Sequence, residues 1–222
     1  MDNKKLNWGE PDIDTKYWAE EITFKDFLRD DPETPSCQYN GNPEFSKFCL
    51  LPSPDNIKIF FQKEDYFQGM VLVIFWGSMW DKKSLKKIFT PKLSCIQQTL
   101  KEAKNSIIQE QSINNSWNLL EKNLGWSNVF ISKVLHFLSR SAGFEKNPPV
   151  PIDNGVILNI VWPEFIKRVK HANDNHHKPK SWNSDCICGY LRYMTLINVW
   201  TKQKNWSTTD VEITLYQRFR KQ

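Results

Sequence analysis

Residues 124–138 read LGWSNVFISKVLHFL, a short turn that leads into an apolar stretch with helical spacing. Gly125 interrupts the preceding helical pattern, and Ser127 or Asn128 can cap the helix that follows, which we expect to continue to about Arg140. The stretch therefore predicts two helices joined by a tight turn, and this pair decides the fold.

The second of these helices contains a lysine, and an aspartate follows it in the next loop. Lys133, His136 and Arg140 have helical spacing, so we expect them on one side of the helix, opposite its apolar face. Asp153 ends the segment Val-Pro-Ile-Asp at residues 150–153, where a proline-rich loop becomes another helix that its carboxylate can cap. The sequence thus supplies an amine and a carboxylate close to two helix starts.

An amine and a fixed carboxylate are suited to chemistry at a sugar carbon. A lysine is a nucleophile only as the neutral amine, which requires its pKa to fall from about 10.4 to about 7–8, a bias of roughly 4 kcal/mol. Apolar neighbours favour the neutral form of Lys133, and so does the helix dipole if the residue lies in the first turn. A sugar that loses its base becomes cationic, and a carboxylate such as Asp153 stabilises that charge. The structural alternatives are a surface lysine and a simple helix cap.

The turn, the segment Ser132-Lys133-x-Leu135-His136-Phe137 and the later Pro151-Ile152-Asp153 together resemble the helix-hairpin-helix DNA glycosylases. The resemblance covers roughly residues 112–165 and is closest to the 8-oxoguanine DNA glycosylase branch. It implies a mainly α-helical fold in which Lys133 attacks the anomeric carbon of a flipped nucleotide and forms a Schiff base. Strand scission by β-elimination can follow, and Asp153 steadies the positive charge on the sugar.

Other residues are candidates for binding the substrate and the DNA backbone. We expect substrate contacts from His136, Trp126, Trp76 and Ser132, with core packing as the alternative for each tryptophan and a structural role for the histidine. We expect backbone contacts from Gly125, Ser127 and Arg140, and from a lysine-rich segment that includes Lys82, Lys83 and Lys86. A solvated helix face is the alternative for this segment.

The chain departs from the family pattern in three places. The family's hairpin has two glycines that grip a phosphate, whereas here only Gly125 is present and Ile131 stands where the second is expected. Asn154 and Gly155 follow Asp153, where 8-oxoguanine enzymes often have a histidine nearby. The four cysteines that hold an iron–sulfur cluster in some relatives are absent, so the base specificity stays open and we expect no cofactor.

Patterns elsewhere predict helices over most of the chain. We expect a short strand at 57–62 and an irregular N-terminal layer, residues 1–56, packed on a helical main body, residues 57–222. The expected helices lie at about 17–28, 44–51, 66–76, 90–110, 112–123, 127–140, 190–200 and 208–220, with a further one from Asp153 that Pro163 kinks or restarts.

Composition limits the remaining possibilities. The net charge of +5 is compatible with a polyanionic partner. The five scattered cysteines indicate reduced thiols and a cytoplasmic protein, and the longest apolar run, Met70–Trp76, is too short to cross a membrane. His171, His176, His177, Cys186 and Cys188 invite a zinc site, but their spacing differs from common zinc motifs, so we expect no metal.

The leading functional hypothesis is a DNA glycosylase that excises a modified purine such as 8-oxoguanine through a lysine Schiff base, with an accompanying lyase activity left open. Resemblance to bacterial proteins of anti-phage defence systems implies an alternative, action on a deazapurine-type base or conjugate, with a protein partner encoded in the same operon. The third hypothesis is a non-catalytic nucleic-acid-binding module in which the basic residues carry the binding.

Overall fold

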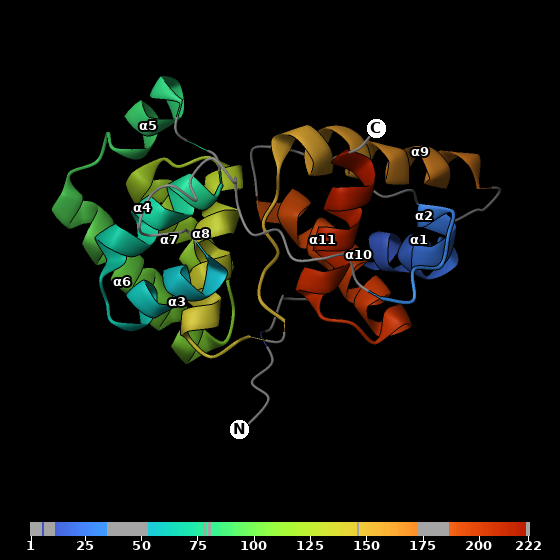
Figure 1. Ribbon diagram of the computed structural model, residues 1–222, viewed down its shortest axis with the longest axis horizontal. Coiled ribbons are helices and arrows are strands. Elements are labelled where there is room, and N and C mark those ends of the chain that lie inside the picture. Colours follow the sequence, from blue (N-terminus) through green and yellow to red (C-terminus); the bar gives the residue numbers. More distant parts are fainter. Residues whose placement is uncertain are drawn as a thin grey trace. The chain divides into compact units, whose positions relative to one another are not determined.

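The computed structural model describes residues 6, 12–34, 53–77, 79, 81–145, 147–172 and 187–220, and no strand occurs among them. The chain forms two compact units (Figure 1). Unit 1 comprises Met1–Asn7 and Tyr39–Pro151, and unit 2 comprises Trp8–Gln38 and Ile152–Gln222. The mainly helical fold is confirmed. The division into residues 1–56 and 57–222 stays a prediction, and the helix expected at 44–51 lies outside the described residues.

Unit 1 is built around a central helix. Its helices are α3 (Pro54–Gln62), α4 (Tyr66–Trp76), α5 (Lys82–Ile88), α6 (Leu93–Glu110), α7 (Asn114–Leu124) and α8 (Asn128–Ser141). Helices α3, α4, α6 and α7 all contact α8, which is buried on every side from Val129 to Ser139. The expectation that Lys133 and His136 lie opposite a single apolar face is therefore wrong, because helices cover both sides of α8.

The strand expected at 57–62 is also wrong, because these residues belong to α3. Ser53 accepts a hydrogen bond from the backbone N–H of Asn56, and Pro54 occupies the first helical position, so the helix has a strong start signal. Ile57 and Phe61, four residues apart, are both fully buried. Because of this cap and this proline, residues 57–62 form a helix, although their apolar and polar side chains alternate weakly as in a strand.

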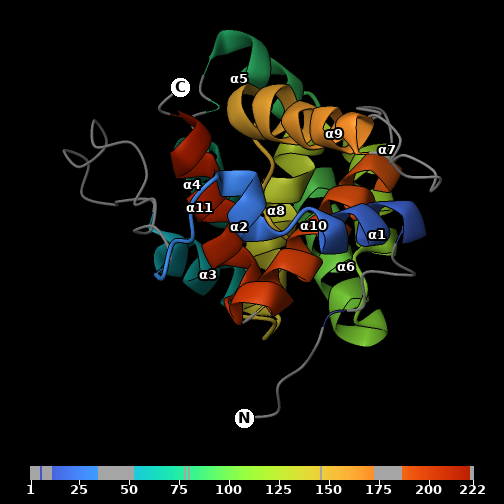
Figure 2. The ribbon, with the colours of Figure 1, turned by 90° about the vertical axis from the view of Figure 1, so that its right-hand side faces the viewer.

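Unit 2 contains α1 (Ile13–Glu21), α2 (Phe24–Leu28), η2 (Asn154–Val161), α9 (Trp162–His171), α10 (Ile187–Lys204) and α11 (Thr208–Arg220) (Figure 2). Large rings form its core: the Phe27 ring lies 4.8 Å from that of Trp200 and 5.5 Å from that of Phe219, centroid to centroid. Distant parts of the sequence, within residues 12–34 and 187–220, thus share one aromatic core. None of the helices in the described ranges is both long and apolar enough to span a bilayer.

The segment after Asp153 is a π-helix, η2, which passes directly into α9. The carbonyl of Asp153 accepts from the backbone N–H of Leu158, five residues later, at 3.0 Å. Pro163 has no N–H, and in an α-helix its ring would crowd the carbonyl of residue 159. Wider turns before the proline relieve this crowding. The helix that begins after Asp153 therefore changes type at Trp162, next to Pro163, where the sequence predicted a kink or a restart.

Candidate functional site

Lys133 lies in the interior of unit 1. Its side chain is 6% exposed, and its Nζ donates a hydrogen bond to the carbonyl oxygen of Gly77 at 3.1 Å. Gly77 is the C-cap of α4, so the amine meets the end of a neighbouring helix. Ser127 occupies the N-cap position of α8, which places Lys133 in the second turn. The dipole effect is confined to the first turn, so the dipole contribution considered for Lys133 does not apply at this position.

Gly77 leaves the space that the lysine occupies. A Cβ atom at residue 77 would lie 2.9 Å from Cδ of Lys133 and 3.1 Å from its Nζ. Contacts this short force one of the two groups to move. The sequence marked Gly77 only as a helix end, and its closeness to Lys133, 56 positions later, appears only in the fold.

A second buried lysine in unit 1 makes a similar bond. Lys104 of α6 is 8% exposed and donates to the carbonyl of Phe61 at 2.7 Å. Burial lowers the pKa of Lys104. Lys104 lies outside the turn and helix that carry the family resemblance, so it is a matched control for the chemistry of Lys133.

His136 lies one turn after Lys133 in an aromatic cluster. Its ring is parallel to Trp76, with 5° between the planes and 6.4 Å between the centroids, and Phe137 meets both rings edge-on. The Nδ1 atom of His136 donates a hydrogen bond to the carbonyl of Pro149 at 2.8 Å. Burial, aided by the charge of Arg140, lowers the pKa of His136 to about 3, so the imidazole is neutral. A neutral ring can position a substrate but cannot neutralise a phosphate.

The buried histidine predicts a loss of stability in acid. Because its pKa is near 3 when folded and about 6.5 when unfolded, the unfolded chain binds the extra proton between these values. We expect this residue to lower the free energy of unfolding by about 1.4 kcal/mol for each pH unit below 6.5. Urea unfolding at pH 7 and pH 5 measures this. His136→Asn keeps a donor for the Pro149 carbonyl, and it should make the free energy of unfolding depend less on pH. If wild type and variant lose the same stability between pH 7 and pH 5, His136 is not the source of the loss.

Two further substrate-binding candidates have their observed partners in the core. Trp126 is 3% exposed, donates its indole N–H to the carbonyl of Ile88 at 3.1 Å and packs edge-on against Phe130. Ser132 is fully buried, and its hydroxyl donates to the carbonyl of Val129 at 2.9 Å. These contacts hold α5 and α8 in place. Substrate contacts from Trp126 and Ser132 stay predictions.

The turn between α7 and α8 is open to solvent at its glycine. Gly125 has φ 62° and caps α7 in the left-handed conformation, and nothing lies within 4 Å of the place where a Cβ would be. Ser127 is the N-cap of α8 but makes no side-chain capping bond. The predicted helix–turn–helix is thus present, and the start of α8 is available for the phosphate contact predicted for Gly125 and Ser127.

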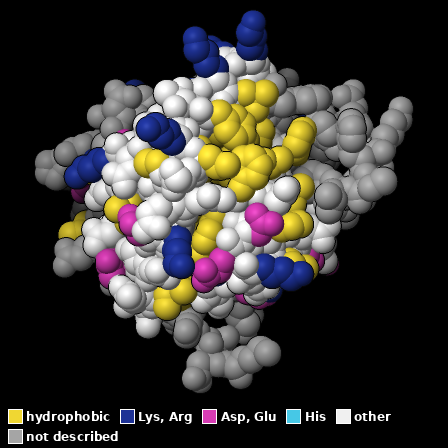
Figure 3. All heavy atoms as spheres, turned by 90° about the vertical axis from the view of Figure 1, so that its left-hand side faces the viewer, with side chains coloured by type: hydrophobic (Ala, Val, Ile, Leu, Met, Phe, Trp, Pro, Cys, Tyr) yellow, Lys and Arg dark blue, Asp and Glu magenta, His cyan; other side chains and the backbone are white. Residues whose placement is uncertain are grey.

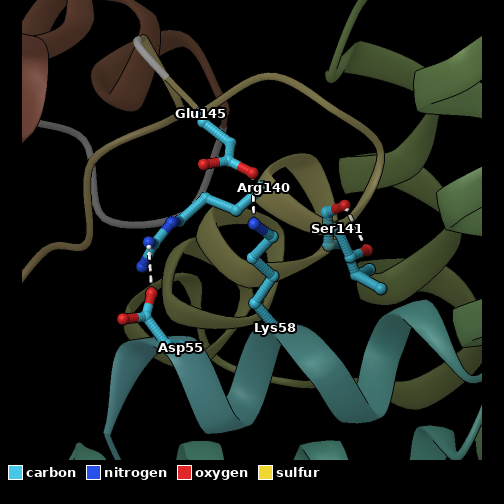
Figure 4. A network of polar contacts seen from close by, with 6 residues as sticks. Asp55, Lys58, Arg140, Ser141 and Glu145 are labelled. Atoms are coloured by element: carbon cyan, nitrogen blue, oxygen red, sulfur yellow. Dashed lines mark hydrogen bonds and ion pairs between the residues drawn. The ribbon is translucent and has the colours of Figure 1, made fainter.

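Arg140 stands in a network of ion pairs at the end of α8 (Figure 4). Its guanidinium donates to Asp55 Oδ1 at 3.1 Å, and Lys58 pairs with Glu145 beside it. These pairs join α3 to α8 and to the loop that follows α8. Arg140 therefore has a structural partner, and its contact with DNA stays a prediction.

The lysine-rich segment forms the exposed helix α5. Lys82, Lys83 and Lys86 are all exposed, and Asp81 caps the helix by accepting from two backbone N–H groups. The ring of Phe89, directly after this helix, is 42% exposed, and that of Phe75, in α4, is 36% exposed. Figure 3 shows an apolar area with Lys and Arg side chains at its edge. Cations beside exposed rings suit contact with an unpaired nucleic acid strand.

Asp153 belongs to unit 2, whereas Lys133 belongs to unit 1. Asp153 is the N-cap of η2, and its Oδ1 accepts from the backbone N–H of Val156 at 2.8 Å. The side chain is half-buried. The predicted cap is therefore present and fixes the carboxylate at a helix start.

The cluster considered for zinc falls largely outside the described residues, which omit His176, His177 and Cys186. Within the ranges that are described, no three His, Cys, Asp or Glu side chains are grouped as metal ligands would be.

A mainly helical chain with a glycine turn between two helices and a buried lysine in the second has the features of the helix-hairpin-helix DNA glycosylase class. Residues 56–216 match the model of the family described as "Putative 8-oxoguanine DNA glycosylase OGG-like protein". The match covers well over half of the chain, which therefore belongs to this OGG-like family. It extends far beyond residues 112–165, on which the sequence patterns first indicated a resemblance. Searches of curated proteins and of solved structures gave no match.

Proposed function

We propose that the protein is a DNA glycosylase that removes a modified purine, such as 8-oxoguanine, with Lys133 as the nucleophile. Family membership supports glycosylase-type chemistry on DNA or a nucleobase. The observation that carries the lysine mechanism is the buried side chain of Lys133 in the helix after the hairpin, whose amine donates a hydrogen bond to the carbonyl of Gly77. Burial favours the neutral, nucleophilic amine over the ammonium form.

In the proposed reaction the Nζ lone pair attacks C1′ of the extruded nucleotide. The bond from C1′ to the base nitrogen breaks, and its electrons leave with the base, which takes up a proton. Nζ then loses a proton, its lone pair forms the C=N bond of the Schiff base as the C1′–O4′ bond breaks, and O4′ takes up a proton. Borohydride reduces this Schiff base to a stable amine, so a trapped protein–DNA adduct reports the step directly.

The experiment is borohydride trapping on duplexes that carry one modified purine each, with an undamaged duplex as the control. We expect a covalent adduct with at least one modified-base duplex and none with the control. Absence of an adduct across the panel, with base release still detected, would contradict the Schiff-base mechanism. Absence of both would contradict glycosylase action on these bases.

We assign to Asp153 the stabilisation of the developing sugar cation. Asp153→Asn removes the charge but can still cap η2, so we expect base release to slow by roughly 10²–10³-fold with little change in Tm. Asp65→Asn is the control, because Asp65 caps α4 in the same manner. Single-turnover rates and melting curves provide the measurements. Equal rates for Asp153→Asn and wild type would remove Asp153 from the mechanism.

We assign to α5 a part in holding the DNA backbone. Replacing Lys82, Lys83 and Lys86 by alanine should weaken binding uniformly across sequences and reduce the log–log salt slope by about 0.9 per lysine that contacts a duplex phosphate. Fluorescence anisotropy over a salt series gives the slope. Lys101→Ala, an exposed change on α6, should leave the slope unaltered. A triple variant with the wild-type slope would make α5 an ordinary solvated helix.

A second candidate substrate is a free or conjugated deazapurine-type nucleotide, as the anti-phage alternative implies. The turn between α7 and α8 favours this candidate, because it has one left-handed glycine, and Ile131 lies fully buried within α8. A turn with one such glycine instead of two holds a DNA phosphate less firmly, which suits a substrate other than a long duplex. Release of base from free nucleotides but not from duplexes would favour it, and the encoded gene neighbours would show whether a protein partner accompanies it.

A further inference from the structure

Unit 2 contains a cationic cavity that the glycosylase mechanism does not use. Its volume is about 530 Å³, and it lies where the ends of α2 and α11 meet η2 and the first turns of α9. Four of its lining residues are cationic, Arg29, Lys167, Arg168 and Arg218, and one, Glu164, is anionic. The excess of positive charge favours an anionic ligand.

One arginine is part of the cavity wall. Arg168 donates through Nη1 to the carbonyl of Asp26 at 2.6 Å and through Nε to Glu164 at 3.1 Å, and its guanidinium lies 4.8 Å from the Phe27 ring centroid. Glu164 and Arg168 thus offset each other. The positive charge that remains for a ligand comes from the other three cations.

These three cations are exposed, and their own bonds are few. Lys167 lies 3.9 Å from Glu164 and is 68% exposed, and Arg218 forms a half-exposed ion pair with Asp30 at 2.7 Å. Arg29 is exposed and makes no ion pair within the described part of the chain. Exposed ion pairs contribute little, so an incoming anion can replace Asp30 as the partner of Arg218 at small cost.

The backbone of Arg29 is in a conformation that favours glycine. It caps α2 with φ 63°, in the left-handed region, which costs a residue with a side chain about 1–2 kcal/mol. A large charged side chain at such a position is held at the cavity despite this strain.

We propose that this cavity binds a phosphorylated small molecule of nucleotide size. Arg29, Arg218 and Lys167 would hold the phosphate, since guanidinium groups bind phosphate oxygens in pairs. Half-buried Ile160 and exposed Pro163 supply an apolar surface for the organic part. The volume lies within the usual range for small-ligand sites, about 300–1,000 Å³. The proposal goes beyond the glycosylase function and does not depend on it, because Lys133 belongs to unit 1.

Isothermal titration calorimetry of the full chain with guanosine 5′-monophosphate (GMP) tests the site. We expect saturable binding of GMP, with guanosine and inorganic phosphate each at least about 10-fold weaker, because each lacks one half of the contacts. Arg218→Ala should weaken GMP binding and leave borohydride trapping unchanged, which separates this site from the glycosylase site. No saturable GMP binding, or equal binding of guanosine, would overturn the proposal. Binding of a 5′-phosphorylated single strand without binding of GMP would overturn it in favour of nucleic acid.

Arg29→Gly gives two effects of opposite sign. It should raise Tm by about 2–4 °C, because glycine adopts the left-handed conformation without strain, and weaken GMP binding at least about 10-fold. Gln111→Gly is the matched control, because Gln111 caps α6 with φ 49°; it should raise Tm similarly and leave binding unchanged. Wild-type affinity in Arg29→Gly would contradict the assignment. Arg218→Ala, which should also weaken binding, checks the cavity independently of backbone strain.

Discussion

Lys133→Gln should abolish borohydride trapping and slow base release by at least about 10³-fold. Loss of a principal catalytic group typically lowers the rate of an enzyme by this much or more. The glutamine side chain is one bond shorter than that of lysine but keeps an N–H donor on the side of the Gly77 carbonyl, while the nucleophile is lost. DNA binding should be retained, because the exposed lysines of α5 are unchanged. Gel-resolved trapping, single-turnover rates and anisotropy give the three readouts.

Lys104→Gln is the control for this experiment. Lys104 is buried to a similar degree and also donates to a carbonyl at a helix end, so any effect of removing a buried lysine charge is shared by the two variants. Trapping should persist in Lys104→Gln. Equal trapping by both variants would mean that an amine other than that of Lys133 forms the Schiff base.

Gly77→Ala should displace the Lys133 amine without changing any group that takes part in the chemistry. The added methyl would lie 2.9 Å from Cδ and 3.1 Å from Nζ of Lys133, so the side chain has to shift. A shift of about 1 Å at a reacting group costs up to about 10²-fold in rate, and overpacking of this kind costs about 1–3 kcal/mol of stability. Single-turnover rates and urea unfolding measure the two effects.

Gly69→Ala separates the loss of rate from the loss of stability. Gly69 is in the same helix, α4, and a Cβ there would meet the Phe61 ring at 2.9 Å. Overpacking should destabilise this variant to a similar degree but leave trapping intact. If Gly69→Ala and Gly77→Ala lose activity in proportion to their stability, the position of the Lys133 amine is not what limits the reaction.

The local features of the fold could be predicted from the sequence. Gly125 ends α7 and Ser127 begins α8 because their conformational preferences act within a few residues. Asp153 caps η2 for the same reason. The error at residues 57–62 arose because their weak alternation outweighed the start signal at Ser53 and Pro54. The type of the helix after Asp153 was not predicted, since the π-form depends on how Pro163 is accommodated.

The surroundings of the candidate site depend on contacts between distant residues. That Lys133 is buried follows from four helices around α8, and its partner Gly77 lies 56 positions earlier. The core contacts of Trp126 with Ile88, and the ion pair of Arg140 with Asp55, likewise join separate helices. The cavity around Arg29 unites three segments of unit 2. Periodicity and spacing carry no information on such pairings.

Mass spectrometry of the borohydride-trapped adduct tests the central claim most directly. After digestion of protein and DNA, the account predicts that the sugar remnant is attached to Nζ of Lys133, in the tryptic peptide Asn123–Arg140. A remnant on Lys104, on a lysine of α5 or on any other amine would contradict it.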